Sequence, residues 1–379
     1  MNFEEHAAKP LLGKHGILTP QGWLAITPED AEAAARALGA CVVKAQVPTG
    51  KRGKAGGIKL AATPAEAAAH TKSIIGMSID GWPVEKVLVE QQLPFVRELY
   101  AAILNDSASK GPMLLFSGLG GMDVEEAAAK DPTAMRRVAI AIEKGLGAEQ
   151  AREAVAGLGL DTVADKLVDT LLALYAAYRA LDAELIEINP LVVTEGGNIV
   201  ALDCKLTLDD SATYRQAEIA AKASPEKQTV LEAKAAAAGL RYIELGGSVG
   251  VLANGAGLTM TTMDVIAHYG GTPANFLEIG GEAYTKAKTA LSILLENPNV
   301  KSLLVNFCGA FARTDVMAEG VIAAWQDLKP DIPIFFTIHG TGEDEAVKLV
   351  KERLAIEPFD LMDDAVKAAV AAASGRITA

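Results

Sequence analysis

The last third of the chain repeats one unit, a short apolar strand followed by a glycine turn and a helix, and this repeat constrains the fold more than any other feature. Strands are expected at residues 249–253, 275–279, 302–307 and 332–338. Helices are expected at residues 258–269, 284–295, 315–328 and 343–354. Strand-helix units with short connections predict a parallel sheet with helices on both faces.

Glycines follow these expected strands, at residues 254–257, 280–281, 309 and 340–342. Open parallel sheets bind ligands beyond the carboxyl ends of their strands, so this edge is expected to bind one. The first turn lacks the third glycine of a dinucleotide fingerprint, which makes it a poor match to an NAD site. Glycine in each single turn also has a purely steric explanation.

A basic glycine-rich loop lies between two expected strands, at residues 41–44 and 58–60, near the start of the chain. Its glycines and basic residues crowd into eight positions: Gly50, Lys51, Arg52, Gly53, Lys54, Gly56 and Gly57. Bare backbone can approach phosphates closely, and the cationic heads can neutralise them. A flexible surface loop is the alternative, and the crowding favours a phosphate cover.

Further elements are expected in this first part of the chain. A helix is expected at 31–38, strands at 86–92 and 113–117, an acidic helix start at 122–126, and two helices within 132–181. Glu90, at the end of an apolar strand, could accept hydrogen bonds from a ribose or an adenine amino group. Taken singly, a carboxylate in this position is more often just the end of a strand.

A hairpin is expected where two apolar runs flank the turn signal at residues 194–198. Alternation along a strand places Glu187 and Asn189 on one face, and Asp203 on the returning strand. If the chain folds back at this turn, Asn189 lies opposite Asp203 within about one residue of register. Two oxygen ligands then converge, as Mg²⁺ requires when phosphate and water complete its shell. An ordinary hairpin with polar groups on its wet face is the alternative.

Composition limits the classes of partner. The formal charge of −13 argues against nucleic acid or an anionic membrane as the main partner. No apolar run reaches transmembrane length and the first residues are acidic, so a soluble, intracellular protein is expected. Cys41, Cys204 and Cys308 form no paired motif and are expected to be reduced, packed thiols. The five histidines have no metal-ligand spacing.

Over nearly its whole length the chain resembles the β subunits of succinyl-CoA synthetase and related ADP- or GDP-forming acid-CoA ligases, including malate-CoA ligase. The motifs that carry the resemblance lie at residues 43–47, 51–57, 88–90, 97–100, 185–192, 202–205, 254–258 and 271–277. The resemblance implies an α/β protein with an ATP-grasp nucleotide-binding domain at 1–235. A flavodoxin-like, doubly wound CoA-ligase domain is implied at 236–379. The composition itself places the connection between the domains in the charged, alanine-rich segment 217–238, which has no strand signal.

The resemblance also implies a set of site residues. The positions that match the family's nucleotide contacts are Lys44, Lys51, Arg52, Gly53, Glu90, Leu93 and Glu98. Asn189 and Asp203 match its magnesium ligands, and Glu187 matches the carboxylate that faces a phosphorylated histidine. The positions that match its organic-acid contacts are Asn254, Ala310, Phe311 and Ala312.

The family mechanism implies partners that this chain lacks. An α subunit would bind CoA and carry the histidine, in an αβ pair or an α2β2 assembly in the cytoplasm. Phosphate would pass among ATP or GTP, phosphohistidine and an acyl phosphate before the thioester forms, with Mg²⁺ and basic groups stabilising the charge.

The acid-facing half departs from the family pattern. The usual Gly-Gly-Ile-Val-Arg is here Gly309-Ala310-Phe311-Ala312-Arg313, so the acid could be succinate, malate or another small carboxylic acid. Three alternatives stay open beside the ligase subunit: an ATP-grasp enzyme that joins a carboxylate to an amine, a subunit of a citrate-activating ligase, and a noncatalytic assembly subunit. The strand-helix units after Asn254 argue against the first of these.

Overall fold

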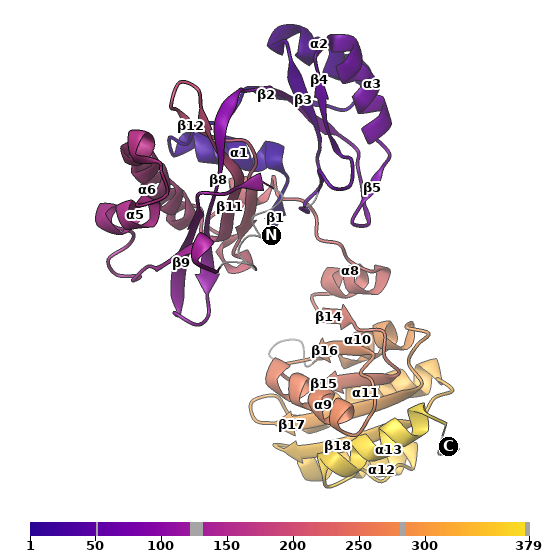
Figure 1. The fold of residues 1–379 in the computed structure, drawn as a ribbon. Helices are drawn as coiled ribbons and strands as arrows, with labels where there is room; N and C mark the ends of the chain where they lie inside the picture. Colours follow the sequence, from indigo (N-terminus) through magenta and orange to yellow (C-terminus); the bar gives the residue numbers. More distant parts are fainter. Residues whose placement is uncertain (51, 122–131, 281–284, 376–379) are drawn as a thin grey trace. The chain divides into compact units, whose positions relative to one another are not determined.

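The computed structural model describes residues 1–50, 52–121, 132–280 and 285–375 and divides into two compact units, Met1–Glu226 and Lys227–Ala379 (Figure 1). The change of unit falls inside the charged, alanine-rich segment expected to connect the domains, and before the residue-235 boundary of the sequence prediction. Each unit has hydrophobic clusters of its own.

A four-stranded antiparallel sheet forms the smaller layer of the first unit, in the order β2-β7-β3-β4. Its strands are β2 (Gly22–Ala25), β7 (Val87–Gln91), β3 (Cys41–Ala45) and β4 (Ile58–Ala61). Helices α2 (Pro28–Leu38) and α3 (Pro64–Ile74) pack on one face. Thr27 begins α2 with a capping box, and proline follows at the first turn. The short strands β5 (Ser78–Ile79) and β6 (Trp82–Pro83) form a separate hairpin.

A larger antiparallel sheet has the order β1-β13-β11-β8-β9-β10, with β12 paired to β11. Its strands are β1 (Asn2–Phe3), β8 (Phe95–Asp106), β9 (Gly111–Ser117), β10 (Arg136–Ala139), β11 (Ala183–Thr194), β12 (Ile199–Ala201) and β13 (Lys205–Leu208). The helices of this layer are α1 (Glu5–Lys14), α5 (Ala148–Val155) and α6 (Ala164–Ala180), followed by the short α7 (Ala217–Ala220). Two helices within 132–181 are as expected, and strand β10 was not.

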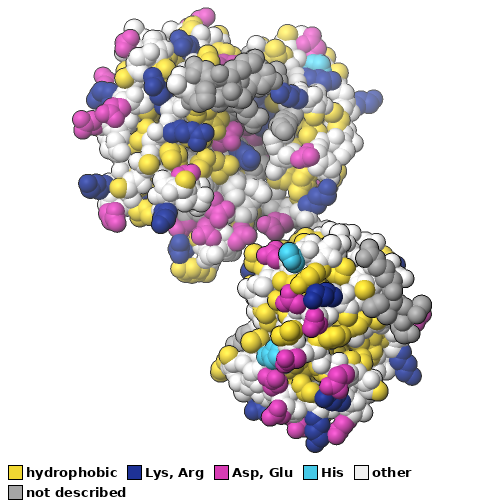
Figure 2. Space-filling model, turned by 60° about the horizontal axis from the view of Figure 1, so that its bottom comes forward, with side chains coloured by type: hydrophobic (Ala, Val, Ile, Leu, Met, Phe, Trp, Pro, Cys, Tyr) yellow, Lys and Arg dark blue, Asp and Glu magenta, His cyan; other side chains and the backbone are white. Residues whose placement is uncertain are grey.

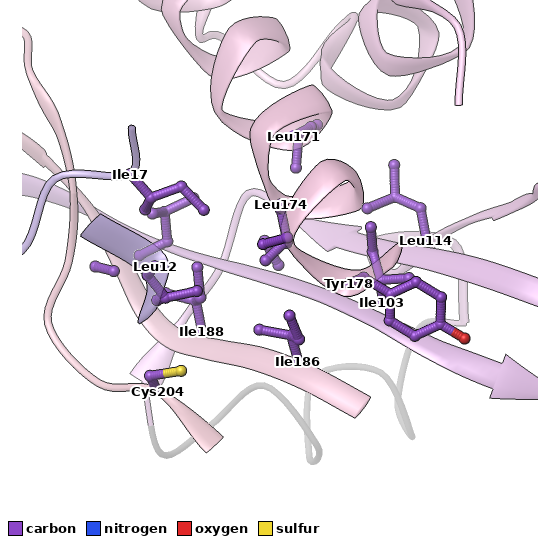
Figure 3. Close-up of a cluster of buried hydrophobic side chains, with 14 of the residues drawn as sticks. Leu12, Ile17, Ile103, Leu114, Leu171, Leu174, Tyr178, Ile186, Ile188 and Cys204 are labelled. Atoms are coloured by element: carbon purple, nitrogen blue, oxygen red, sulfur yellow. The ribbon is translucent and has the colours of Figure 1, made fainter. Parts of the chain in front are cut away.

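The core beneath the larger sheet positions the hairpin. Ile186 and Ile188 of β11 point toward Leu171 and Leu174 of α6, and Leu12 of α1 joins the same cluster (Figure 3). Because successive strand residues alternate faces, Glu187 and Asn189 lie on the opposite face of β11. The apolar face of β11 therefore directs its polar residues away from α6.

The second unit contains the expected parallel sheet, in the order β14-β16-β15-β17-β18. Its strands are β14 (Arg241–Glu244), β15 (Val249–Ala253), β16 (Asn275–Glu278), β17 (Ser302–Gly309) and β18 (Ile334–Gly340). The helices are α8 (Val230–Ala237), α9 (Ala256–His268), α10 (Ala287–Leu295), α11 (Thr314–Leu328), α12 (Glu343–Leu354) and α13 (Met362–Ala373). Helices α10, α11 and α12 cover one face, and α9 and α13 cover the other. The antiparallel edge strand β14 was not predicted.

Surface and cysteines complete the comparison with the sequence. On the face drawn in Figure 2, Lys and Arg side chains are scattered among Asp and Glu. None of the described helices has the length and apolar character to cross a membrane.

Cys41 and Cys204 are buried and burial raises the pKa of both thiols, as suits packed cysteines. The expectation is wrong for Cys308, which is exposed because it lies at the open end of β17.

Candidate active site at the glycine loop and hairpin

A network of charged side chains fills the space between helix α1, the smaller sheet and the hairpin. Val43 and Val89 face the core under α2 and α3, so their neighbours Lys44 and Glu90 point to the other face of the sheet. There they meet side chains from three distant segments. The members of the network are Glu5, Lys9, Lys44, Arg52, Glu90 and Asp203. Asp203 is partly exposed and the other five are buried.

Glu5 is the carboxylate at the centre of the network. It lies 2.6 Å from the ammonium of Lys9, 2.9 Å from that of Lys44 and 2.8 Å from the Arg52 guanidinium. Glu90 accepts from Lys9 with one oxygen and from Lys44 with the other, each at 2.6 Å. The two lysines also donate to the carbonyl oxygen of Leu202, each at 2.6 Å.

Arg52 links the glycine loop to the hairpin. Its Nη2 donates to both oxygens of Asp203, at 2.5 and 2.6 Å, and its Nη1 donates to Glu5 and to the carbonyl oxygen of Ala45. Charge-assisted bonds of this kind are stronger than neutral ones. The loop can close over β3 because Gly57 has no side chain, since a Cβ there would lie 2.7 Å from Ile79 and 3.0 Å from Ala45.

The pKa shifts follow from burial and pairing. Burial alone raises the pKa of Glu5, but Lys44, Lys9 and Arg52 more than offset this and hold it well below its usual value. Burial opposes the charged form of Lys44 and Arg52 as well, and the neighbouring carboxylates again reverse the effect and raise both pKa values. Three cations thus face three carboxylates, and the network is neutral as a whole.

The hairpin has the expected register. Leu191 is paired with Ala201 nearer the turn, and Glu187 is paired with Lys205 farther from it. Asn189 and Asp203 occupy the matching positions between these pairs, next to the cis peptide bond of Pro190. The carboxamide of Asn189 accepts from the Gly121 backbone N–H at 2.7 Å and donates to the Gly121 carbonyl at 3.1 Å.

A pocket of about 130 Å³ opens between the glycine loop and the hairpin. Its lining includes Glu5, Gly50, Arg52, Glu187, Asn189 and Asp203. The pocket therefore brings together the basic loop and all three hairpin residues singled out from the sequence. A carboxylate and a carboxamide oxygen are hard donors that suit Mg²⁺. The described residues hold no cluster of three or more His, Cys, Asp or Glu side chains that could bind a metal alone.

The remaining predicted nucleotide residues lie around this pocket or beyond it. Glu90 is committed to Lys9 and Lys44, so in this structure it is part of the charge network. Glu98 lies on β8, opposite Val192 of β11. Its carboxylate lies against Gly121, since a Cβ added to this glycine would be 2.3 Å from the nearer carboxylate oxygen. Gly53 is exposed in the loop and Leu93 is half-buried between β7 and β8. Lys51 and the helix start expected at 122–126 lie outside the described residues.

The predicted acid-binding residues lie in the second unit, at the carboxyl ends of β15 and β17. Asn254 accepts from the Cys308 N–H and donates to the Cys308 carbonyl, both at 2.8 Å, and so ties these two strand ends together. Ala310, Phe311 and Ala312 follow β17, and Phe311 is 92% exposed. Their loop precedes α11, which begins at Thr314.

Glu5 and Lys9 belong to the site and were missed from the sequence. They sit four residues apart near the start of α1, a spacing that usually indicates an exposed pair on one helix face. The signal that distinguishes them is the apolar residues of the same helix: Ala8, Leu11 and Leu12 make this helix part of the core. A charged pair in such a helix is buried and must find further partners.

Because the pKa of Glu5 is lowered in the folded protein, the free energy of unfolding should depend on pH. An ionised Glu5 stabilises the fold fully above its unfolded pKa of about 4.3, and that contribution is lost as the pH falls toward the lower folded value. Glu5→Gln should therefore be less stable than wild type at pH 7, and the difference should shrink below about pH 4. Urea unfolding midpoints of both proteins at each pH measure this. A difference that stays constant from pH 7 down to about pH 3 would contradict the assignment.

Comparison with known proteins identifies the families of both domains. Residues 2–193 match the ATP-grasp domain family, and residues 252–374 match the CoA-ligase family. The GDP-forming succinate-CoA ligase subunit beta of Thermus thermophilus is 42% identical over 99% of this chain and 100% of its own length. The ADP-forming subunit beta of Chloroflexus aurantiacus is 43% identical over the full length of both chains.

One solved structure shows the same fold. An ATP citrate lyase from Methanothrix soehngenii, in complex with citrate and coenzyme A, superimposes with a TM-score of 0.73. It is 24% identical and the match covers 97% of this chain and 98% of that one. The succession of the two domains therefore agrees with relatives in sequence and in structure.

Proposed function

Since the chain belongs to the family of succinate-CoA ligase β subunits, we propose that it is the nucleotide-binding subunit of an acid-CoA ligase that forms ADP or GDP. The enzyme would use ATP or GTP to join a small carboxylic acid to CoA. A separate α subunit would supply the CoA site. An αβ pair or α2β2 assembly in the cytoplasm is part of the same proposal.

One observation carries the proposal: the pocket in which Arg52 of the glycine loop meets Asp203 beside Glu187 and Asn189. Among the described residues, Arg52 lines this pocket and Lys44 lies in the charge network beside it, and both would offer positive charge to nucleotide phosphates. Asp203 and Asn189 would hold Mg²⁺, which neutralises charge on the phosphates when it is bound. In this structure Asp203 is bonded to Arg52 and Asn189 to the Gly121 backbone. Both side chains must therefore exchange these partners when the metal binds.

Glu187 would act in the phosphoryl transfer. A histidine nitrogen of the α subunit attacks the terminal phosphorus of the nucleotide, a P–N bond forms, and the P–O bond to the departing NDP breaks. As the histidine loses its proton and gains phosphate, a carboxylate beside it orients the ring and stabilises positive charge on it. Glu187 lines the pocket together with Asn189, and this position supports the proposed role.

The acid would enter at the second unit. Its carboxylate oxygen takes the phosphoryl group from the histidine and gives an acyl phosphate. The CoA sulfur then forms the thioester and inorganic phosphate leaves. Asn254 and the loop of Ala310, Phe311 and Ala312 lie at strand ends where such sheets bind ligands. Succinate is the leading substrate because the relatives are named for it, and the altered loop makes malate or another small acid the main alternative.

Reconstitution with the α subunit tests the proposal. The chain should be co-purified with the α subunit encoded by the same organism and assayed for ADP or GDP release. Release should require CoA, Mg²⁺ and one acid from a panel that includes succinate, malate and citrate. The ligase proposal fails if no acid supports release while the complex is intact.

A further inference from the structure

Asp203, the carboxylate proposed above as a metal ligand, is already bonded to an arginine. Both oxygens of Asp203 accept from Nη2 of Arg52, at 2.5 and 2.6 Å, and Asp203 Oδ1 also accepts from the Cys204 N–H at 2.8 Å. The other proposed ligand, Asn189, is bonded to the Gly121 backbone through both ends of its carboxamide. A metal ion arriving alone would have to compete with a guanidinium for its one protein carboxylate.

Arg52 is itself held in this position by the rest of the network. Its side chain is 6% exposed, and its Nη1 donates to Glu5 at 2.8 Å and to the Ala45 carbonyl at 3.1 Å. Glu5 is buried and is fixed in turn by Lys9 and Lys44. Moving Arg52 away from Asp203 into water would therefore break its two bonds to this carboxylate and disturb its buried bonds to Glu5 and Ala45.

Nucleotide phosphates can replace Asp203 as the partner of Arg52. They offer Arg52 a new anionic partner inside the pocket, and guanidinium groups bind phosphate and carboxylate with the same two-pronged geometry. Asp203 then becomes available to the metal, and the phosphates supply the oxygen ligands that the pocket lacks. Binding of the nucleotide therefore favours binding of the metal, and binding of the metal favours binding of the nucleotide.

We infer that Arg52 is an internal counter-ion of Asp203, which it releases only to nucleotide phosphates, so that the metal ion enters this pocket together with the nucleotide. The inference rests on the proposed nucleotide site and adds the order of events within it. Because binding free energies are linked, the metal must strengthen nucleotide binding by the same factor as the nucleotide strengthens metal binding.

Manganese is a suitable probe, because its electron paramagnetic resonance signal reports free Mn²⁺ directly. Wild-type chain should bind Mn²⁺ weakly alone and at least about tenfold more tightly with ADP present, after correction for Mn-ADP in solution. Arg52→Gln should bind Mn²⁺ without nucleotide at least about tenfold more tightly than wild type, because Asp203 is then unpaired. Arg36→Gln removes an exposed arginine that pairs with Glu32 and should behave as wild type.

A second measurement uses only the wild-type chain and so does not depend on the variant's folding. Its thermal unfolding midpoint should be unchanged by Mn²⁺ alone and raised by Mn²⁺ with ADP. Tight binding of Mn²⁺ alone to wild type, equal to that of Arg52→Gln, would overturn the counter-ion role while leaving the nucleotide site intact. Failure of wild type to bind ADP with or without Mn²⁺ would instead overturn the proposed site on which the inference rests.

Discussion

Glu187→Gln is expected to abolish formation of phosphohistidine on the α subunit, with a loss of labelling rate of about 10²–10³-fold. Glutamine keeps the size of the side chain and removes the negative charge that would face the imidazole as it becomes positive. The pocket's metal and phosphate groups are not altered, so Mg-ADP affinity should stay within about twofold of wild type. Transfer of radiolabelled phosphate from ATP to the α subunit in the purified complex measures the effect.

Glu184→Gln provides the control for this experiment. Glu184 lies on the same strand, β11, and is exposed outside the pocket. Its variant should label the α subunit at the wild-type rate. Normal labelling in the Glu187→Gln complex would remove Glu187 from the mechanism, while loss of both labelling and Mg-ADP binding would indicate a disturbed pocket.

Lys44→Met is expected to destabilise the first unit by about 3–5 kcal/mol, the usual effect of removing one partner from a buried ion pair. Lys44 pairs with Glu5 and Glu90 and donates to the Leu202 carbonyl. Without it, three carboxylates face only Lys9 and Arg52, and the network carries an uncompensated negative charge away from water. The same change also removes a cation that the nucleotide would use.

Fluorescence can isolate the first unit in this measurement. The chain has three tryptophans, and only Trp325 lies in the second unit, so a Trp325→Phe background reports unfolding through Trp23 and Trp82. In that background Lys72→Met is the matched control, because Lys72 is exposed on α3, and its effect should stay within about 0.5 kcal/mol. Equal stability of the two variants would show that the network around Lys44 contributes nothing to the fold.

Much of the fold could be predicted because its elements have clear periodicity and clear ends. Strand β15 and helix α12 match the expected ranges, 249–253 and 343–354, since glycines bound an apolar run in one case and begin an amphipathic helix in the other. Strands β10 and β14 could not be predicted. Each has four residues and begins with arginine, so its pairing depends on a neighbouring strand that the local sequence does not identify.

The hairpin could be predicted for a physical reason as well. Its turn signal and its alternation fix the register, and a register shift of one residue would turn Ile186 and Ile188 out of the core. Asn189 and Asp203 are thus placed opposite each other by apolar neighbours as much as by their own chemistry. The role of Glu5 and Lys9 could not be predicted, because nothing local shows that a helix near the start of the chain lies against residues 44, 52, 90 and 202.

The sequence identifies the glycine loop as a motif but does not predict which residues its arginine contacts. The crowding of glycine and basic residues indicates a phosphate site, and the structure places Arg52 at the pocket as that interpretation requires. It also shows Arg52 bonded to Asp203, a contact between two residues that the sequence assigned to separate ligands. Such a contact depends on tertiary structure, since the two residues are 151 positions apart.

Calorimetric titration of ADP into the wild-type chain and into Asp203→Asn, with Mg²⁺ and again with EDTA, tests directly whether this pocket is a magnesium-nucleotide site. We expect Mg²⁺ to strengthen ADP binding to wild type at least about tenfold and to have no effect on the variant. In EDTA the variant should bind ADP at least as tightly as wild type, because Arg52 is no longer held by the carboxylate. Equal strengthening by Mg²⁺ in both proteins would contradict the assignment of Asp203 and of the pocket built around it.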